Sequence, residues 1–472
     1  MRVRNPRTGE HDYEIVPLDG SQVGAAAAAL RERQVAWAAR SPAARAEVLR
    51  AFAGAVAGRR DAIAAALTAD TGRRAISAIE VDGAVRMIER WAATAPDLIA
   101  RTLGAERPSA TPGIVLRTNL VPYSLVGVIS PWNFPLTLAL IDAIPALAAG
   151  CAVLVKPSEV TPRFVRPLMD AVAAVPDLPL AVIEGDGATG AAMVEAVDYI
   201  AFTGSVATGR KVAAAAAAAF IPASLELGGT DPMIVLASAD PVWAAGVALR
   251  ASVVNTGQAC QSIERVYVAR AIAPAFLEAL VAGAKAVRLN ADDIGAGEIG
   301  PFIFARQAEI VQAQIDDARA RGARVLAGGQ IEAIGGGLYL RPTVLTDVPA
   351  DALLMREETF GPVIPVGVFD TEDEAVALAN QGEFGLSAAV LAGDAAEAEA
   401  VAVQLRAGAV SINDGSLTAM VWDAEKSSFG ASGLGPSRMG DSGLLRFLRR
   451  QALIRQTGQA LPLAAYAEDA GR

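Results

Sequence analysis

The chain contains very little histidine and cysteine, and this scarcity limits the chemistry that it can perform. Its 472 residues include one histidine, His11, and two cysteines, Cys151 and Cys260. A His-based catalytic triad and a His-rich metal site are excluded, so we predict no metal site. Any general base must then be a carboxylate, Lys, Cys or water. Two cysteines give no disulfide framework, which favours a reducing, cytoplasmic compartment.

Long apolar runs and excess positive charge are also lacking. No apolar stretch reaches the roughly 20 residues that span a bilayer, and the first residues lead into no apolar signal segment. The net charge is −10, so we expect neither nucleic acid nor a membrane surface as a partner. Hydrophobic residues make up 53% of the chain and charged residues 19%, a balance typical of a globular enzyme with a large core.

The first 120 or so residues predict helices followed by a β-hairpin. Ser41 before Pro42 is typical of a helix start. Further on, Ile114–Arg117 and Leu120–Tyr123 predict a hairpin around Thr118-Asn119. Such a projecting hairpin needs a partner for its edge, either another chain or the C-terminal segment.

The middle of the chain alternates strands and single helices, which predicts an α/β fold with a parallel sheet covered on both faces. Helices are expected near 135–148, 161–175, 188–196 and 206–219, and the strands at Leu125–Ser130, Ala152–Val155, Leu180–Ile183, Tyr199–Phe202 and Ala223–Leu227. Ligands of such sheets bind at the carboxyl ends of the strands. The residues that follow each strand are therefore the candidates for function.

Polar side chains do follow these strands. Asn133 comes after the first strand, and its amide is a donor of the kind that steadies an oxyanion, although Asn in a loop is ordinarily a turn residue. Lys156 and Glu159 come after the second, where they could hold the two hydroxyls of a ribose or simply pair with each other. Glu226 ends the fifth strand, where it could activate water or a thiol or remain a solvated carboxylate.

Two glycine-rich turns are candidates for phosphate binding. Gly185–Gly190 fits the pattern G-x-G-x-x-G but follows the third strand and lacks the expected acidic residue after it. Gly204–Gly209 is better placed, because it opens a long helix whose free amides and positive dipole end can face a phosphate. Ser205 adds a hydroxyl donor there.

Cys260 lies just past a glycine in the short polar turn Asn255–Cys260, with apolar residues on both sides. A thiolate nucleophile needs such polar, partly exposed surroundings, although most free cysteines are small buried hydrophobes. Cys151, inside an apolar strand, fits the second description.

Taken in order, these motifs resemble those of the NAD(P)-dependent aldehyde dehydrogenase superfamily over nearly the whole chain. The motifs are Pro131-Trp132-Asn133-Phe134, Lys156-Pro157-Ser158-Glu159, Phe202-Thr203-Gly204-Ser205 with Gly209, Glu226-Leu227-Gly228-Gly229, Gly257-Gln258-Ala259-Cys260 and Glu357–Pro362. Each motif is weak alone, but together and in this order they are highly specific. The chain departs from the family pattern at Thr230, where many members have Lys, and in the C-terminal loop, which lacks Gly-Gly-x-Lys.

The resemblance implies roles for particular residues. Cys260 would be the nucleophile, Asn133 and the Cys260 backbone N–H would hold the oxyanion, and Glu226 would activate water to hydrolyse the thioester. The cofactor would be NAD, favoured over NADP because Glu159 would repel a 2′-phosphate. The implied cofactor-binding residues are Trp132, Lys156, Glu159, Gly204, Ser205, Gly209, Leu227, Glu358 and Phe360.

The resemblance also implies a fold of three parts. A Rossmann-like NAD-binding domain would comprise 1–103 and 123–228, and an α/β catalytic domain 229–446. A small β oligomerisation element would comprise 104–122 and 447–472 and build a homodimer or homotetramer.

The substrate is expected to be a small aldehyde that binds in a mostly apolar tunnel. That tunnel is predicted to be lined by Phe134, Thr137, Ile141, Val254 and Trp422, with Met420 beside them. Its character favours aliphatic or aromatic aldehydes, although Arg438 could instead anchor a substrate carboxylate, as in a semialdehyde dehydrogenase. Two further alternatives are a CoA-acylating relative, against which Glu226 argues, and a non-catalytic protein that keeps only the fold, against which Cys260, Glu226 and Asn133 together argue.

Overall fold

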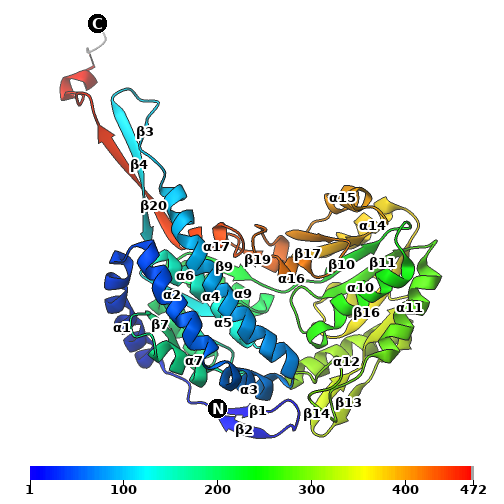
Figure 1. Ribbon diagram of the computed structural model, residues 1–472. Coiled ribbons are helices and arrows are strands. Elements are labelled where there is room, and N and C mark those ends of the chain that lie inside the picture. Colours follow the sequence, from blue (N-terminus) through cyan, green and yellow to red (C-terminus); the bar gives the residue numbers. More distant parts are fainter. Residues whose placement is uncertain (469–472) are drawn as a thin grey trace.

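The computed structural model describes residues 1–468 of the chain and shows two α/β bodies and a projecting β arm (Figure 1). One body is built on a six-stranded sheet and the other on a seven-stranded sheet, while the arm is a three-stranded sheet. Two-stranded ribbons lie at the N-terminus, β1 (Arg2–Arg4) with β2 (His11–Glu14), and in the second body, β13 (Ile331–Ile334) with β14 (Gly337–Leu340). No helix within residues 1–468 is long and apolar enough to cross a membrane.

The six-stranded sheet has the order β19-β9-β8-β5-β6-β7, and all pairs except β19 with β9 are parallel. The five parallel strands confirm the predicted alternation. Their bounds are β5 Leu125–Ile129, β6 Ala152–Lys156, β7 Leu180–Val182, β8 Tyr199–Thr203 and β9 Ala223–Glu226, and the antiparallel edge is β19 Gly433–Leu434.

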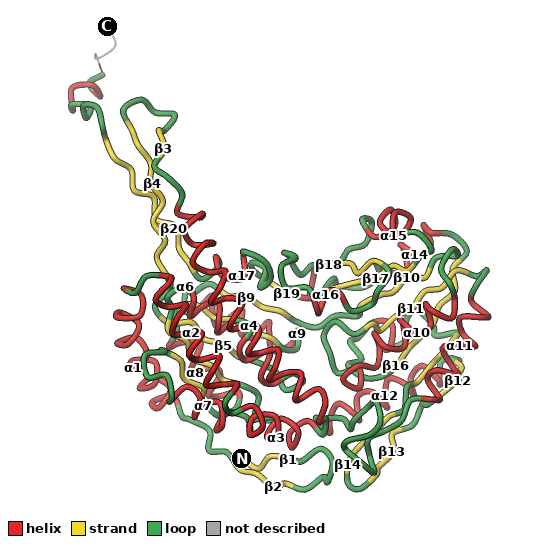
Figure 2. The backbone as a smooth tube through the Cα atoms, in the orientation of Figure 1, coloured by secondary structure: helices red, strands yellow, loops and turns green. Residues whose placement is uncertain are grey.

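Helices cover both faces of this sheet, as Figure 2 shows. Leu49, Phe52 and Val56 of the predicted N-terminal helix are completely buried against one face, and Ser41 caps that helix by accepting a hydrogen bond from the Ala44 N–H. The helices on that face are α2 Pro42–Ala57, α4 Arg74–Leu103, α6 Ala143–Ala149 and α7 Val165–Ala173, with α3 Arg60–Thr71 beside them. Those on the other face are α1 Gly20–Ala39, α8 Gly187–Ala196 and α9 Val206–Ala218.

The single helix expected near 135–148 is divided in two, α5 (Pro135–Leu140) and α6, with Ile141 and Asp142 between them. Pro145 explains the division, because it has no N–H to donate to the carbonyl one turn earlier. The break leaves Asp142 at the start of α6, where its side chain meets arginines from the C-terminal part of the chain.

The seven-stranded sheet has the order β12-β15-β16-β11-β10-β17-β18 and is parallel except at the β12 edge. Its strands are β10 Asp231–Val235, β11 Ile263–Ala269, β12 Arg324–Ala327, β15 Thr343–Thr346, β16 Val363–Phe369, β17 Ser387–Leu391 and β18 Ala409–Ile412. Its main helices are α10 Pro241–Val253, α11 Ala273–Ala286, α12 Ala305–Ala320, α14 Glu372–Ala379 and α15 Ala395–Ala402, with short α13 Leu353–Arg356 and α16 Leu417–Met420. The short α17 Ser442–Leu445 instead packs against α6 of the first body.

The predicted hairpin around Thr118-Asn119 is wrong. Residues Ile114–Pro122 form one continuous strand, β4, which pairs antiparallel along its length with β20 (Leu448–Gln456) and briefly with β3 (Arg107–Pro108). The C-terminal strand supplies a complete ladder of partners, so the backbone at Thr118-Asn119 stays extended and opposite Gln451 and Ala452. The expectation that the C-terminal segment would cover this edge is confirmed.

Candidate active site

Cys260 follows a turn with an unusual backbone. Asn255, Thr256 and Gly257 have φ angles of 62°, 60° and 66°, in the left-handed region that non-glycine residues rarely enter. A Cβ atom on Gly257 would lie 2.3 Å from the backbone of Gly361, so the turn requires glycine there. The Cys260 turn is thereby pressed against the Glu357–Pro362 segment, which lies about a hundred residues later in the chain.

Buried hydrogen bonds hold this turn in place. The Asn255 side-chain amide donates to the carbonyls of Gln258 (2.9 Å) and Asn133 (3.2 Å), and the Thr256 hydroxyl donates to the Gly300 carbonyl (3.1 Å). A non-glycine residue in the left-handed region costs about 1–3 kcal/mol and persists only where its surroundings fix it. The bonds from Asn255 and Thr256 provide that constraint.

Glu226 reaches the sulfur from the other body. The Cys260 Sγ atom lies 3.7 Å from Glu226 Oε1, at the carboxyl end of β9. Burial raises the pKa of the Cys260 thiol well above its ordinary value, and the nearby charges of Glu226 and Glu358 raise it further. The thiol is therefore protonated at neutral pH, with a carboxylate oxygen adjacent to accept its proton.

The Asn133 side chain lies beside the same turn. Its Nδ2 donates to the carbonyl of Gln258, two residues before the cysteine, at 3.0 Å. Asn133 is only 2% exposed. Its Oδ1 is buried and has no hydrogen-bond partner among the described residues. The three residues predicted to be catalytic are thus brought together, from β5, β9 and the turn before β11.

Sequence reasoning did not identify the groups that support this cluster. Arg73 donates to the Asn133 carbonyl (3.0 Å) and stacks over the Phe134 ring, 5.7 Å from its centroid. The Gln258 side chain bonds both the Asn255 carbonyl and the Ile303 N–H. Their only sequence signal is proximity to a motif, and Arg73 lacks even that.

The predicted cofactor residues form two groups around this centre. Near Asn133, the rings of Trp132 and Phe360 meet edge to face with centroids 5.4 Å apart. The Phe360 N–H is held by buried Glu264, which sequence reasoning missed because it lies inside an apolar strand. Glu358 accepts a hydrogen bond from the Gly229 N–H at 3.1 Å, and burial raises its pKa.

The second group lies at the carboxyl ends of β6 and β8. The Lys156 ammonium is 3.1 Å from the Glu159 carboxylate, with side-chain exposures of 6% and 35%. At α9, Ser205 caps the helix by accepting from the Thr208 N–H. A Cβ atom on Gly209 would lie 2.5 Å from Leu227, so α9 packs closely on the β9 end.

Comparison with known proteins identifies the family. The model of the aldehyde dehydrogenase family matches residues 1–453. The chain belongs to the aldehyde dehydrogenase family. It is 39% identical over 456 residues to a Mycolicibacterium smegmatis protein named "Putative succinate-semialdehyde dehydrogenase", with NADP(+) in its name, covering 94% of this chain and 87% of the relative.

Solved structures agree over nearly the whole length. The Anabaena variabilis structure "Putative Aldehyde Dehydrogenase PutA" superimposes with a TM-score of 0.95 at 48% identity, covering 98% of this chain and 99% of that one. Betaine aldehyde dehydrogenase from Staphylococcus aureus in complex with NAD+ gives a TM-score of 0.91 at 30% identity, covering 98% and 92%. The expected fold is confirmed, and the protein is an NAD(P)-dependent oxidoreductase acting on aldehydes.

The residues predicted to line the substrate tunnel of this aldehyde dehydrogenase are less uniform than their apolar character suggested. Ile141 is 5% exposed, whereas Val254 and Met420 are 47% and 62% exposed. Trp422 packs against the helical core beneath the Arg90 guanidinium, at 5.3 Å. The Thr137 N–H donates to buried Glu80. The apolar tunnel stays a prediction.

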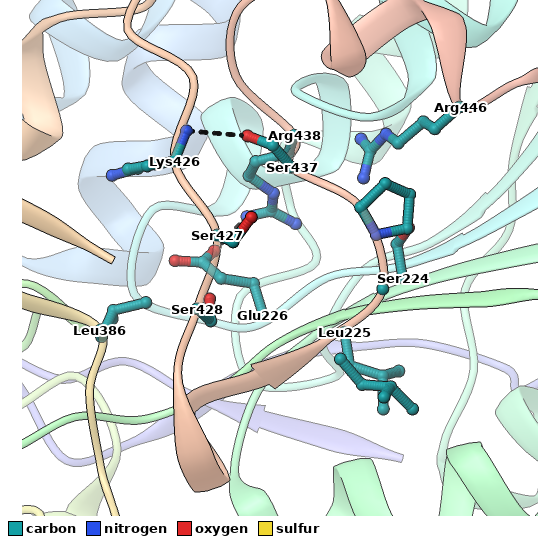
Figure 3. A pocket seen from close by; sticks show the side chains of 13 residues that line it. Ser224, Leu225, Glu226, Leu386, Lys426, Ser427, Ser428, Ser437, Arg438 and Arg446 are labelled. Carbon is teal, nitrogen blue, oxygen red and sulfur yellow. Dashed lines mark hydrogen bonds and ion pairs between the residues drawn. The ribbon is translucent and has the colours of Figure 1, made fainter. Parts of the chain in front are cut away.

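A small open pocket lies beside Glu226 and is lined mainly by the C-terminal loop (Figure 3). Arg438, the suggested carboxylate anchor, already pairs there with Glu226 and Asp142. A substrate carboxylate would have to compete with the Glu226 and Asp142 carboxylates for the Arg438 guanidinium. Two further cations belong to this lining. Arg446 pairs with Asp142, and the Lys426 ammonium donates to the Thr418 carbonyl at 2.7 Å.

The raised pKa of Cys260 predicts slow alkylation at neutral pH. Iodoacetamide should modify Cys260 more slowly at pH 7 than it modifies an unstructured cysteine peptide, and the rate should climb as pH rises beyond about 9, where even an unperturbed thiol has largely ionised. Glu226→Gln removes a charge that raises this pKa, so the rate profile should move to lower pH. Cys260→Ser provides the background from Cys151. Alkylation at pH 7 faster than that of the peptide contradicts this prediction.

Proposed function

We propose that this aldehyde dehydrogenase oxidises its substrate to the carboxylic acid through a thioester on Cys260, which water then hydrolyses. The observation that carries the proposal is the 3.7 Å approach of Glu226 to the Cys260 sulfur, with the Asn133 amide directed at the same turn. Nucleophilic catalysis of this kind divides one difficult oxidation into two easier steps.

In the first step Glu226 Oε1 accepts the thiol proton, and the sulfur attacks the aldehyde carbon to form a thiohemiacetal. The Asn133 Nδ2 and the Cys260 N–H stabilise the negative charge that develops on the former carbonyl oxygen. NAD+ held by the cofactor-binding residues would supply the acceptor for the hydride that leaves this carbon. Collapse of the oxyanion leaves the acyl group on the sulfur as a thioester.

Before the second step Glu226 releases the thiol proton to solvent. It then takes a proton from water, and the resulting hydroxide adds to the thioester carbon. The carbon–sulfur bond breaks, the acid leaves, and the proton held by Glu226 returns the sulfur to a thiol. A CoA-acylating enzyme would need no such base, so Glu226 beside the sulfur favours hydrolysis over acyl transfer to CoA. The same arrangement argues against a non-catalytic protein.

The residues around the centre fit a dinucleotide. Beyond its Ser205 cap, α9 has first-turn amides at Val206 and Ala207 with no partner among residues 1–468, and these suit a pyrophosphate. Lys156 and Glu159 would hold the adenosine ribose, and Glu358 the nicotinamide ribose, with Trp132 and Phe360 near the ring. The remaining contacts would come from Gly204, Ser205, Gly209 and Leu227.

This assignment makes residues 1–103 and 123–228, which build most of the six-stranded sheet, the cofactor domain. Residues 229–446, which build the seven-stranded sheet and add β19 to the edge of the other, become the catalytic domain. The β arm would build a homodimer or homotetramer. Both β20 and β18 are edge strands of their sheets, and every residue of β20 after Leu448 is exposed. Unpaired edges of this kind are templates for pairing with another chain. The arm (104–122 and 447–472) includes 469–472, which lie outside the described residues.

The hydrolytic mechanism predicts different effects for two substitutions. Asn133→Ala should lower kcat roughly a hundredfold or more, because an oxyanion donor contributes about 3–4 kcal/mol. Glu226→Gln should slow the first turnover of NADH, because the acceptor of the thiol proton is lost, and should slow the steady state further, because the base for water is lost as well. Stopped-flow NADH absorbance separates the two phases. An unchanged kcat in Asn133→Ala removes that residue from the mechanism.

The Lys156–Glu159 pair predicts a preference for NAD. A 2′-phosphate placed against the Glu159 carboxylate would be repelled, so kcat/KM should be higher with NAD than with NADP, and Glu159→Gln should narrow that ratio. A higher kcat/KM with NADP in the unmodified enzyme shows that Glu159 does not contact the ribose.

A second candidate function, oxidation of an aldehyde that carries a carboxylate, is favoured by Lys426. Its ammonium has no carboxylate within ion-pair distance among residues 1–468, although the charges of Glu226 and Cys260 act on it and burial lowers its pKa. Figure 3 shows its side chain extending away from Arg438. An unpaired cation near the sulfur suits an anionic substrate, and the Mycolicibacterium relative is named for succinate semialdehyde.

Two aldehydes of equal carbon number, succinate semialdehyde and butanal, distinguish these candidates. If Lys426 binds the carboxylate, the enzyme prefers succinate semialdehyde, and Lys426→Met lowers that kcat/KM by about tenfold or more because a charged hydrogen bond is lost. The value for butanal should stay unchanged. A preference for butanal, or an equal loss for both, contradicts the role of Lys426 and leaves the apolar tunnel standing.

A further inference from the structure

Glu226 is the first member of a buried chain of alternating charges. Its Oε2 pairs with the Arg438 guanidinium, which also donates to Asp142 Oδ2 at 2.8 Å. Arg446 pairs with the other oxygen of Asp142. The side chains of Glu226, Arg438, Asp142 and Arg446 are 13%, 8%, 1% and 1% exposed. Such burial of four charges is costly unless each one is paired, as here.

The two central groups of this series, Arg438 and Asp142, are held in their charged forms by their partners. Burial opposes the charged form of Arg438, but Asp142 and Glu226 outweigh it and raise the pKa of Arg438 above its ordinary value. Burial likewise opposes ionisation of Asp142, yet Arg438 and Arg446 together lower its pKa. Arg438 therefore remains a cation at every pH at which the enzyme can be assayed.

The members come from separate parts of the fold. Glu226 ends β9, Asp142 lies at the break between α5 and α6, and Arg438 comes from the loop after β19, as Figure 3 shows for Glu226 and Arg438. The Thr203 hydroxyl, at the end of β8, accepts a further hydrogen bond from Arg438 at 2.5 Å. The C-terminal loop is thereby attached to two strand ends of the six-stranded sheet.

We propose that Arg438 is a positioning residue for the general base. It holds Oε2 of Glu226 so that Oε1 alone faces the sulfur and receives the proton from water. A glutamate side chain is otherwise free to rotate, and a base displaced by about 1 Å loses roughly a hundredfold in rate. This inference rests on the proposed hydrolytic function. In it, the ion pair between Asp142 and Arg438 keeps Glu226 in that orientation.

The hydrolytic step can be observed by itself. The acyl-enzyme is formed with NAD+ and aldehyde, excess reagents are removed, and the loss of acyl mass from Cys260 is followed by mass spectrometry. Arg438→Met should slow this decay roughly tenfold to a hundredfold. The decay rate of Arg438→Lys should lie between those of Arg438→Met and the unmodified enzyme. An ammonium keeps the charge but cannot bridge Glu226, Asp142 and Thr203 in one plane. A decay rate in Arg438→Met equal to that of the unmodified enzyme overturns the proposal.

A double-mutant cycle with Glu226→Gln separates positioning from general structural damage. If Arg438 acts through Glu226, Arg438→Met has little further effect on the slow decay of Glu226→Gln, since the base is already absent. If Arg438→Met slows acyl-enzyme decay by the same factor in the unmodified enzyme and in Glu226→Gln, the proposal is overturned. Arg163→Met is the matched control: it breaks another buried Arg–Asp pair, Arg163 with Asp70, and should lower Tm while leaving the decay rate unchanged.

Thr203→Val keeps the test decisive if Arg438→Met does not fold. It removes one acceptor of Arg438 and none of the four charges, so it should slow acyl-enzyme decay severalfold with little change in Tm. An unaltered decay rate in both Thr203→Val and Arg438→Lys overturns the proposal. Failure of the proposed function is a different observation, namely that the unmodified enzyme forms no acyl adduct on Cys260 with NAD+ and aldehyde.

Discussion

The structure depends on placing one carboxylate beside a thiol in a buried site. Glu226 lies 3.7 Å from the Cys260 sulfur, where its charge disfavours the thiolate and its oxygen is also the nearest acceptor for the thiol proton. A buried carboxylate without a partner would be strongly destabilising. Arg438 supplies that partner on the opposite oxygen, and the oxygen that faces the sulfur remains available.

This requirement explains why the two bodies and the C-terminal loop converge. Glu226 belongs to the six-stranded sheet and Cys260 to the turn that enters the seven-stranded sheet, so their contact fixes the bodies against each other. The left-handed turn before Cys260 is held by Asn255 on one side and pressed on Gly361 on the other. Arg73 and Asn255 both donate hydrogen bonds to the Asn133 carbonyl. The residue that supplies the oxyanion donor and the turn before the nucleophile are therefore held by the same hydrogen bonds.

Much of this was accessible from the order of motifs. The five parallel strands and the turn residues at their carboxyl ends follow from local patterning, because parallel strands of one sheet place their carboxyl ends along one edge. The joint role of Asn133, Glu226 and Cys260 was implied by the family resemblance, since Cys260 precedes a strand of the other sheet. The errors arose where a partner lies far away in sequence. The supposed hairpin at Thr118-Asn119 is one strand because β20, more than 300 residues later, completes its ladder. The helix expected at 135–148 breaks where Asp142 meets Arg438 and Arg446.

The sequence by itself determined the α/β class through its strand and helix periodicity, and the family through the order of its motifs, which also nominated Cys260, Glu226 and Asn133 as the reacting groups. Only the tertiary structure decided how those groups are supported. Arg438 could be read in the sequence as an anchor for a substrate, and the fold pairs it with Glu226 instead. The reason is physical: a charge is stabilised by whatever lies within a few ångströms of it, and that distance is set by packing between segments that the sequence keeps apart.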